Sequence, residues 1–209
     1  MARIGFIGAS GLMGHGIAKN LQLKGHELAF TVHRNREAVA DLLAAGALEA
    51  KNAADLAAGS EIVFICVTGS PQVEAVVGGP GGLLAGAKPG LIVVDCSTSE
   101  PDSTKSLRER CAAAGVTLVD APLARTPVEA EQGRLNVMVG ADDAVFARLE
   151  PVLHCFAENV AYSVSRPQRN GSRSARQVLC WLDRSYWTDK QEVPKSQSKQ
   201  QIDRDCDPA

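Results

Sequence analysis

The sequence Ile-Gly-Phe-Ile-Gly-Ala-Ser-Gly-Leu-Met-Gly, residues 4–14, decides the fold of the first part of the chain. Its apolar start, residues 4–7, predicts a short buried strand. Residues 15–24 follow with apolar side chains at helical spacing, and Gly25 ends this segment. Gly8, Gly11 and Gly14 are therefore expected in a tight turn between a strand and a helix.

The same alternation of strand and helix continues to about residue 160. Apolar runs predict further strands at residues 28–32, 61–67, 91–95, 116–120 and 135–139. Helical spacing and capping residues predict helices at residues 37–45, 53–58, 70–77, 101–114 and 141–153. Strands that alternate with helices in this way indicate an α/β fold with a mainly parallel sheet covered on both faces. Right-handed crossovers then give a doubly wound sheet of the Rossmann type.

The composition changes after Val160. Both tryptophans and both tyrosines follow this residue, and glutamine occurs three times before it and six times after it. The polar closing stretch cannot offset the entropy of ordering, so residues 161–209 are expected to form a divergent, disordered polar tail. Two interpretations are open: a genuine tail, or a reading frame or exon structure that departs from the ancestral gene near Val160.

The composition also excludes several functions. A net charge of −2 gives no electrostatic footprint for nucleic acid. The sequence has no apolar run long enough to span a membrane and no apolar signal segment at its start. Its six cysteines lack metal-like spacing, and Cys66 and Cys96 lie in apolar runs, which is typical of reduced core residues. We therefore expect a cytoplasmic protein that binds no metal, nucleic acid or membrane.

The glycine turn predicts a site for a dinucleotide. A helix that begins in such a turn offers free N–H groups and the positive end of its dipole to a pyrophosphate. The spacing is G-x-x-G-x-x-G, one residue longer than the common G-x-G-x-x-G, so the role of each glycine stays open. The alternative is a tight turn without a ligand. We expect residues 1–160 to form an NAD(P)-binding domain, with these cofactor contacts: Gly8, Ala9, Ser10, Gly11, Leu12, Met13 and Gly14.

The end of the second strand bears on the choice of cofactor. An acidic residue there would bind the adenosine ribose of NAD, whereas arginine suits the 2′-phosphate of NADP. This sequence carries Arg34 and Arg36 at that place, which favours NADP, with NAD possible. The alternative is two solvated arginines at the start of a helix.

Several motifs in the same order resemble the β-hydroxyacid dehydrogenases. This family includes 3-hydroxyisobutyrate dehydrogenase and tartronate semialdehyde reductase and is related to 6-phosphogluconate dehydrogenase. The resemblance covers about residues 2–160, and its motifs are residues 4–8, 11–21, 94–98, 120–122 and 133–140. It implies an NAD(P)-dependent oxidoreductase that acts on small β-hydroxyacids or semialdehydes.

The resemblance also implies roles for single residues. The three glycines would hold the pyrophosphate, and Arg34 would contact the 2′-phosphate. Val67 and Thr68 would pass near the cofactor, and Thr98 matches the family threonine beside the nicotinamide. Ser97 and Thr98 have a second interpretation, as caps of the helix that begins at Pro101, and this is compatible with cofactor contact.

The substrate loop departs from the family pattern. After Asp-Ala-Pro the family usually has a small residue followed by Ser-Gly-Gly, but this chain has Leu123, Ala124, Arg125 and Thr126. The serine hydroxyl is missing at Ala124. Arg125 and Thr126 could instead hold a substrate carboxylate, because a guanidinium makes bidentate contacts. Equally, Arg125 could be a solvated loop residue.

The catalytic lysine of the family has no counterpart. In the family it lies on a long helix after the equivalent of Val160, acts as general acid and base, and belongs to a helical domain that completes the active site and the dimer. This chain has no lysine between Val160 and Lys190, so we assign no catalytic residue. The resemblance to the family stops near Val160, where the composition also changes, and this coincidence favours a shifted frame or an alternative exon over a genuine tail.

The sequence therefore leaves three functions to weigh. The first is an NAD(P)-dependent dehydrogenase of the family, with NADP binding as the best-supported activity. The second is a truncated or frameshifted module that binds the cofactor without catalysis. The third, a short-chain reductase, needs a Tyr-x-x-x-Lys pair, but the fourth residue after Tyr162 is Arg166, which argues against it.

Overall fold

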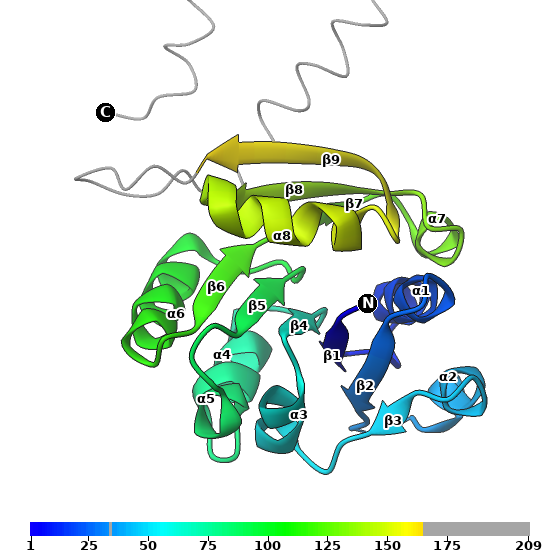
Figure 1. Cartoon of the computed structure of the whole chain (residues 1–209), viewed down its shortest axis with the longest axis horizontal. Coiled ribbons are helices and arrows are strands. Elements are labelled where there is room, and N and C mark those ends of the chain that lie inside the picture. Colours follow the sequence, from blue (N-terminus) through cyan, green and yellow to red (C-terminus); the bar gives the residue numbers. More distant parts are fainter. Residues whose placement is uncertain (34, 165–209) are drawn as a thin grey trace, which may run out of the picture. The chain divides into compact units, whose positions relative to one another are not determined.

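A computed structural model describes residues 1–33 and 35–164 of the chain. These residues contain a nine-stranded sheet with the strand order β3-β2-β1-β4-β5-β6-β8-β7, and β9 pairs with β8 (Figure 1). The expectation of an α/β, mainly parallel, doubly wound sheet is confirmed. Most of the predicted tail, residues 165–209, lies outside the described residues, and so does Arg34.

The first six strands are all parallel. β1 lies in the middle of this set, where Ile4 pairs with Leu28 of β2 on one side and with Ile62 of β4 on the other. These strands are β1 (Arg3–Ile7), β2 (Glu27–Thr31), β3 (Leu48–Glu49), β4 (Ile62–Ile65), β5 (Ile92–Asp95) and β6 (Thr117–Asp120). β4 and β5 are buried along their whole length, as expected of strands that helices cover on both faces.

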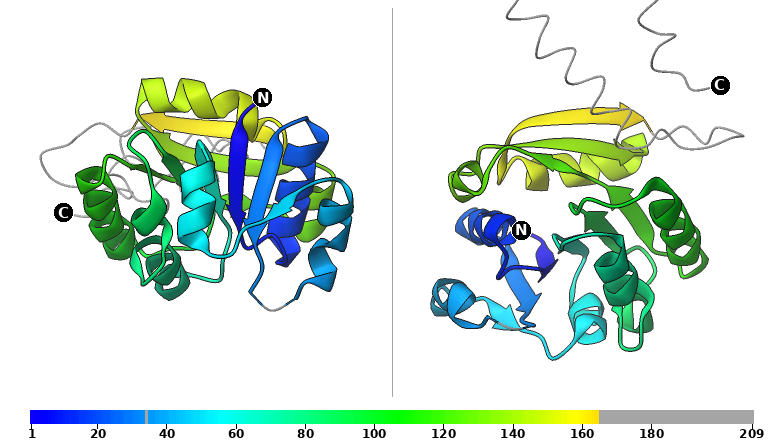
Figure 2. Two further views of the ribbon diagram at one scale, coloured as in Figure 1. Left: turned by 60° about the horizontal axis from the view of Figure 1, so that its bottom comes forward. Right: turned by 180° about the vertical axis from the view of Figure 1, so that it is seen from behind.

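Helices cover the sheet on two faces, and each face has its own apolar core (Figure 2). Phe6 of β1 contributes to the core beneath α1 (Leu12–Leu23) and α2 (Ala40–Ala44), while its neighbour Ile7 contributes to the other core. This alternation follows from the two-residue period of a strand. The second core is covered by α3 (Ala53–Gly59), α4 (Ser70–Gly78), α5 (Leu83–Gly86) and α6 (Pro101–Ala113).

The last part of the sheet reverses direction. β8 (Leu135–Ala141) runs antiparallel to β6 and to β7 (Leu123–Ala124), and α8 (Asp143–Leu153) connects it to the parallel strand β9 (Ala157–Val164). The sequence predicted neither β7 nor β9. β9 crosses the expected domain boundary at residue 160 and continues through Val164. The ring of Tyr162 stacks on Phe146 of α8 with centroids 3.9 Å apart, so this residue is part of the fold and not of the tail.

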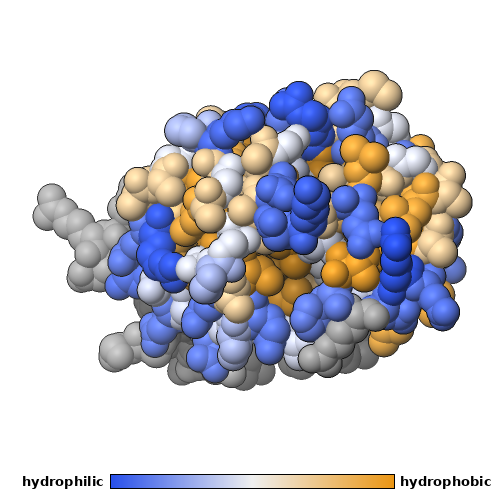
Figure 3. Space-filling view, turned by 90° about the horizontal axis from the view of Figure 1, so that it is seen from below, coloured by the Kyte–Doolittle hydropathy of each residue, from blue (hydrophilic) through white to orange (hydrophobic). Residues whose placement is uncertain are grey.

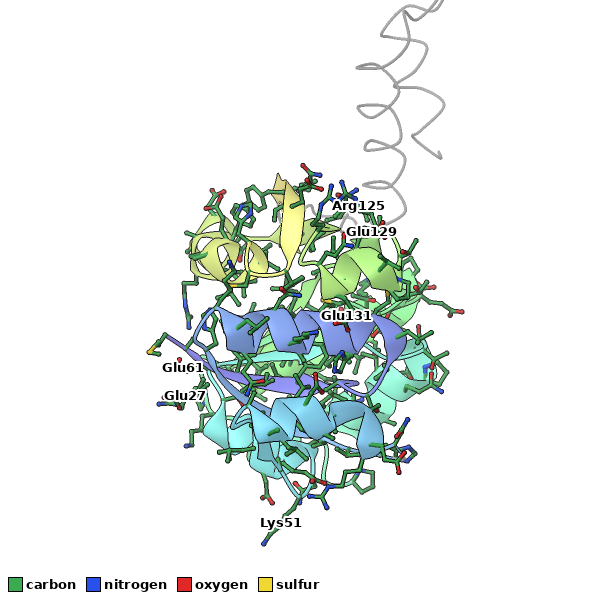
Figure 4. All side chains as sticks on the ribbon, turned by 90° about the vertical axis from the view of Figure 1, so that its right-hand side faces the viewer. Glu27, Lys51, Glu61, Arg125, Glu129 and Glu131 are labelled. Carbon is green, nitrogen blue, oxygen red and sulfur yellow. The ribbon has the colours of Figure 1, made fainter. Side chains whose placement is uncertain are left out.

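The short helix α7 (Pro127–Glu131) packs against α1 and is hydrogen-bonded to it. A Cβ atom on Gly16 would lie 2.4 Å from the carbonyl carbon of Ala130, so the two helices approach closely. His15 of α1 bonds Glu131 of α7 at 2.5 Å and Asp41 of α2 at 3.0 Å. Burial lowers the pKa of His15, but its bonds to Glu131 and Asp41 outweigh this effect and raise the pKa above its usual value. Figure 4 shows Glu131 between α7 and α1.

None of the helices in the described part of the chain is both long enough and apolar enough to cross a lipid bilayer. Within residues 1–33 and 35–164, no three His, Cys, Asp or Glu side chains gather as metal ligands.

A cavity of about 370 Å³ lies near the amino-terminal ends of β1 and β2. Leu28, Ala29, Leu48 and Leu56 line it, and Glu49, Lys51 and Asp55 add charge. Figure 3 shows apolar side chains between hydrophilic ones on the face seen from below Figure 1. Because the glycine turn follows the carboxyl end of β1, this cavity lies at the other end of the strand.

Candidate functional site

The site expected for a cofactor lies where β1 and β4 lie side by side. The chain leaves β1 toward β2 on one side and leaves β4 toward β5 on the other, so the strand order reverses between them. In open α/β sheets this switch point, at the carboxyl ends of the strands, is where ligands bind. Gly8 follows β1 with φ +96°, and a Cβ atom there would lie 2.0 Å from the carbonyl oxygen of Cys66, which follows β4. Glycine is therefore required at this position.

The amino end of α1 points its backbone donors into this edge. Gly11 is the N-cap, its amide donates to the carbonyl of Gly8 at 2.9 Å, and none of the described side chains caps the helix. The first turn of the helix has no acidic residue. The amides of Leu12, Met13 and Gly14 thus have no partner inside the helix, and the helix dipole adds positive potential. This arrangement suits an anion such as a pyrophosphate.

The third glycine has a packing role in the structure. Gly14 is buried, and a Cβ atom there would lie 2.1 Å from the carbonyl oxygen of Gly8 and 3.2 Å from the ring of Phe6. Gly14 therefore permits α1 to pack closely on the end of β1. Gly11 is exposed and less confined, because its Cβ would meet only the Gly8 carbonyl, at 3.2 Å.

The structure brings the expected residues of β4 and β5 together at the same edge. Val67 is half-buried, and Thr68 and Thr98 are exposed. The hydroxyl of Ser97 accepts a hydrogen bond from the amide of Val67 at 3.0 Å, which joins the loops after the two strands. The capping interpretation of Ser97 and Thr98 is wrong, since α6 begins after Glu100 without a side-chain cap.

At the end of β2 the structure describes one of the two expected arginines. Arg34 lies outside the described residues. Arg36 starts a single 3-10 turn, η1 (Glu37–Val39), and its guanidinium lies 2.9 Å from the carboxylate of Glu49, next to β2 on β3. Both side chains are partly or largely exposed, so water and salt screen this ion pair.

The expected substrate residues make contacts within the protein. Arg125 has φ +91°, although it is not a glycine, and its guanidinium donates to the carbonyl of Arg134 at 2.5 Å and to the carboxylate of Glu158. The hydrogen bond from Arg125 lowers the pKa of Glu158. Arg125 is therefore an ion-paired residue and not the freely solvated one that the sequence offered as an alternative. Ala124 lies in β7, which pairs with β8.

Thr126 is the N-cap of α7. Its hydroxyl accepts a hydrogen bond from Val128, and the Glu129 carboxylate accepts one from the Thr126 amide at 3.0 Å, which forms a capping box. The hydrogen bonds from Thr126 lower the pKa of Glu129. Figure 4 labels Arg125 and Glu129 near α7. A substrate-binding role for Ala124, Arg125 and Thr126 stays a prediction.

Two carboxyl groups at this edge received no role from the sequence. Asp95 ends β5 and Asp120 ends β6, and the two residues are direct partners in the sheet. Burial, with a contribution from the charge of Asp95, raises the pKa of Asp120 to about 6. The sequence does place both residues, because each aspartate comes at the end of an apolar run, and the carboxyl ends of parallel strands lie at the same edge as the glycine turn.

The parallel sheet, the switch point and the uncapped glycine-rich turn together define a dinucleotide-binding domain of the kind found in nicotinamide-dependent oxidoreductases. The profile of the NAD binding domain of 6-phosphogluconate dehydrogenase matches residues 3–164. The chain belongs to this family, and the resemblance inferred from its motifs is confirmed. The domain that it contains is one that binds a nicotinamide dinucleotide.

Named relatives are hydroxyacid dehydrogenases and reductases. The chain is 38% identical over 158 residues to 2-(hydroxymethyl)glutarate dehydrogenase of Eubacterium barkeri, which covers 76% of this chain and 52% of the relative. It is 34% identical to 2-hydroxy-3-oxopropionate reductase of Escherichia coli, over 87% of this chain and 61% of the relative. The chain therefore spans about half to three fifths of the length of these curated relatives.

Solved structures agree with the fold. 3-Hydroxyisobutyrate dehydrogenase from Salmonella typhimurium superposes with a TM-score of 0.75 and 29% identity, over 90% of this chain and 66% of that one. The same enzyme type from Mycobacterium tuberculosis, solved with L-serine, has a TM-score of 0.75 at 22% identity, over 87% of this chain and 60% of that one. This second likeness concerns the fold alone.

Proposed function

We propose that this chain binds NADP at the switch point and serves as the cofactor-binding part of a dehydrogenase of small β-hydroxyacids or semialdehydes. One observation carries the proposal: the free amides of Leu12, Met13 and Gly14 lie beside a glycine turn that leaves no room for a side chain at Gly8. Such amides hold a pyrophosphate without any charged side chain. The substrate class follows from the named relatives.

The proposed cofactor contacts follow the strand order. The pyrophosphate would lie on residues 8–14, between β1 and α1. The adenosine half would then lie over the end of β2, and the nicotinamide half over the ends of β4 and β5, next to Val67, Thr68 and Thr98. The exposure of Thr68 and Thr98 supports this, since both side chains are open to a ligand.

The preference for NADP rests on Arg34 and Arg36. Both arginines stand where an acidic residue would favour NAD, and a guanidinium binds a phosphate bidentately. The ion pair of Arg36 with Glu49 is exposed, so a phosphate can compete for this guanidinium at small cost. NAD is the less favoured cofactor.

Hydride transfer to a substrate is a separate question from cofactor binding. The resemblance assigns acid–base catalysis to a lysine, and the sequence has none between Val160 and Lys190. The proposed cofactor contacts described above all precede this segment. We therefore expect cofactor binding to occur without turnover of a hydroxyacid by this chain alone.

Calorimetry with NADPH and NADH tests the proposal. We expect binding of both, with NADPH the tighter ligand, and no oxidation of NADPH with a panel of semialdehydes. The variant Arg34→Asp should lower the affinity for NADPH relative to NADH by about tenfold, which corresponds to loss of one charged hydrogen bond. Equal affinities in the wild type, or an unchanged ratio in the variant, would remove the case for NADP.

A further inference from the structure

A buried carboxylate organises the loop after β5. Asp95 is 2% exposed, and its two oxygens accept hydrogen bonds from the amide of Ser97 at 2.9 Å and from the hydroxyl of Ser99 at 2.7 Å. Both donors follow Asp95 within four residues, so the carboxylate turns the loop back onto the end of its own strand.

The loop folded by Asp95 is joined to the loop after β4. The Ser97 hydroxyl accepts from the Val67 amide at 3.0 Å, and the Ser70 hydroxyl accepts from the Glu100 amide at 2.7 Å. Ser97, after β5, therefore accepts from the backbone that follows β4, and Ser70, at the start of α4, accepts from the backbone that follows β5. The backbone that carries Thr68 and the backbone that carries Thr98 are held as one unit.

Stability alone gives a poor reason for a carboxylate in this place. Burial of a charged group costs free energy, and the charge of Asp95 also acts on Asp120, its partner in β6. A charged acceptor does give shorter and stronger hydrogen bonds than a neutral one. Asp95 thus orders this loop through two charge-assisted hydrogen bonds that offset the cost of its burial.

We propose that Asp95 is a positioning residue that, through Ser97, holds the Val67–Thr68 and Thr98 segments in place for the nicotinamide half of the cofactor. This inference rests on the proposed function. The order β2-β1-β4-β5 carries the argument, because a dinucleotide whose pyrophosphate lies at β1 and whose adenosine lies at β2 must extend its other half over β4 and β5.

The test compares a whole dinucleotide with its adenosine half. Calorimetry with NADPH, NADH and ADP is carried out on the variants Ser97→Ala, Asp95→Ala and Asp95→Asn. We expect Ser97→Ala and Asp95→Ala to weaken both dinucleotides about tenfold and to leave ADP within about twofold, since ADP does not reach β4 and β5. Asp95→Asn should recover most of the affinity, because its amide can still accept from Ser97 and can donate to Ser99.

Ser103→Ala is the matched control. It also removes one serine hydroxyl that makes a hydrogen bond, since the Ser103 hydroxyl donates to the carboxylate of Glu74 at 2.6 Å on the exposed surface between α6 and α4. This variant should bind every ligand as the wild type does. Hydrogen exchange of the Val67 amide in the free protein provides a second measurement, and it should become faster in Ser97→Ala and stay unchanged in Ser103→Ala.

The outcomes separate the inference from the proposed function. If the wild type binds no dinucleotide, the proposed function is wrong and the inference falls with it. If the wild type binds but Ser97→Ala weakens ADP as much as NADPH, or weakens neither, Asp95 and Ser97 do not position the nicotinamide half. Should Asp95→Ala fail to fold, Ser97→Ala alone decides, because it removes a single hydroxyl and leaves the buried Asp95 carboxylate in place.

Discussion

Two loops of this protein place different residue types at nearly the same positive φ. Gly8, in the turn after β1, has φ +96°, and Arg125, in the loop after β7, has φ +91°. At Gly8 the place of a Cβ atom is taken by the Cys66 carbonyl, whereas the side chain of Arg125 has room and finds Glu158 and the carbonyl of Arg134. A positive φ thus favours glycine, but only a close backbone approach demands it.

The difference also leads us to expect different functions for the two loops. The turn at Gly8 keeps backbone donors free at the start of α1, and these are suited to a ligand. The loop at Arg125 replaces the glycine of the family pattern by a residue that is ion-paired within the protein. The first loop is therefore expected to keep the family's cofactor site, and the second to depart from the family's way of holding a substrate.

The largest expected effect tests whether close approach, and not φ, makes Gly8 necessary. Gly8→Ala should abolish measurable NADPH binding and lower the free energy of unfolding by about 3 kcal/mol, because its methyl group meets a backbone carbonyl. Gly46→Ala is the control, since Gly46 has φ +95° and nothing within 4 Å of the added Cβ. It should cost only about 1 kcal/mol and leave binding intact. Equal losses in the two variants would mean that strain alone explains Gly8.

A second prediction concerns Asp120, which lies between the two loops in the chain. Its folded pKa of about 6 exceeds the ordinary value of 3.8, so the folded state holds this proton more firmly than the unfolded state does. Its contribution to the free energy of unfolding should therefore fall as the pH rises from about 4 to about 6 and stay low above that. The loss should amount to about 1–3 kcal/mol.

Urea denaturation of the wild type and of Asp120→Asn across this range measures the effect. The difference between the two proteins isolates Asp120 from His15 and its carboxylate partners, which also titrate. A difference that stays constant from pH 4 to pH 7 would contradict the assignment.

The third prediction tests whether the ion pair compensates the strained backbone at Arg125. In the background Glu158→Ala, where the carboxylate is gone, Arg125→Gly should stabilise the protein by about 1 kcal/mol through relief of strain. In the wild-type background the same change should be nearly neutral, because relief of strain and loss of the ion pair oppose each other. Thermal unfolding of the wild type, the two single variants and the double variant gives the coupling free energy between residues 125 and 158. Destabilisation by Arg125→Gly in both backgrounds would show that the backbone is not strained.

The smallest effect is expected at the other arginine–glutamate pair. Arg36 pairs with Glu49 as Arg125 pairs with Glu158, but Arg36 has φ −78°, an ordinary helical value. Glu49→Ala should change the free energy of unfolding by less than about 0.5 kcal/mol. If Glu49→Ala lowers the free energy of unfolding as much as Glu158→Ala does, the positive φ of Arg125 does not distinguish the two ion pairs.

The sequence predicted the first loop well because its signals are local. An apolar run, three glycines and a helical period stand next to each other, and β1, α1 and β2 follow from them within a few residues. The free amides of α1 also follow from local sequence, because Gly11 offers no capping side chain. The Asp95 loop could have been found in the same way, from the spacing of Asp95, Ser97 and Ser99.

The second loop could not be predicted because its contacts are distant in sequence. Arg125 is 33 residues from Glu158, and no residue type beside Arg125 in the sequence predicts its positive φ. The sequence does not predict β9 for a related reason. Glu158 and Asn159 interrupt its apolar pattern with polar residues, whereas its pairing with β8 is a contact between separate segments. The change in composition near Val160 suggests a boundary, but the sheet gains its last strand there.

The central claim is that a cofactor phosphate sits on the first amides of α1. Titration of ¹⁵N-labelled protein with NADPH, followed by two-dimensional NMR, tests it most directly. We expect large, saturable shifts of the Leu12, Met13 and Gly14 amides, with Gly46 unaffected. Shifts confined to residues around the cavity at the opposite end of β1, such as Leu48 and Ala50, or no shifts at millimolar NADPH, would contradict it.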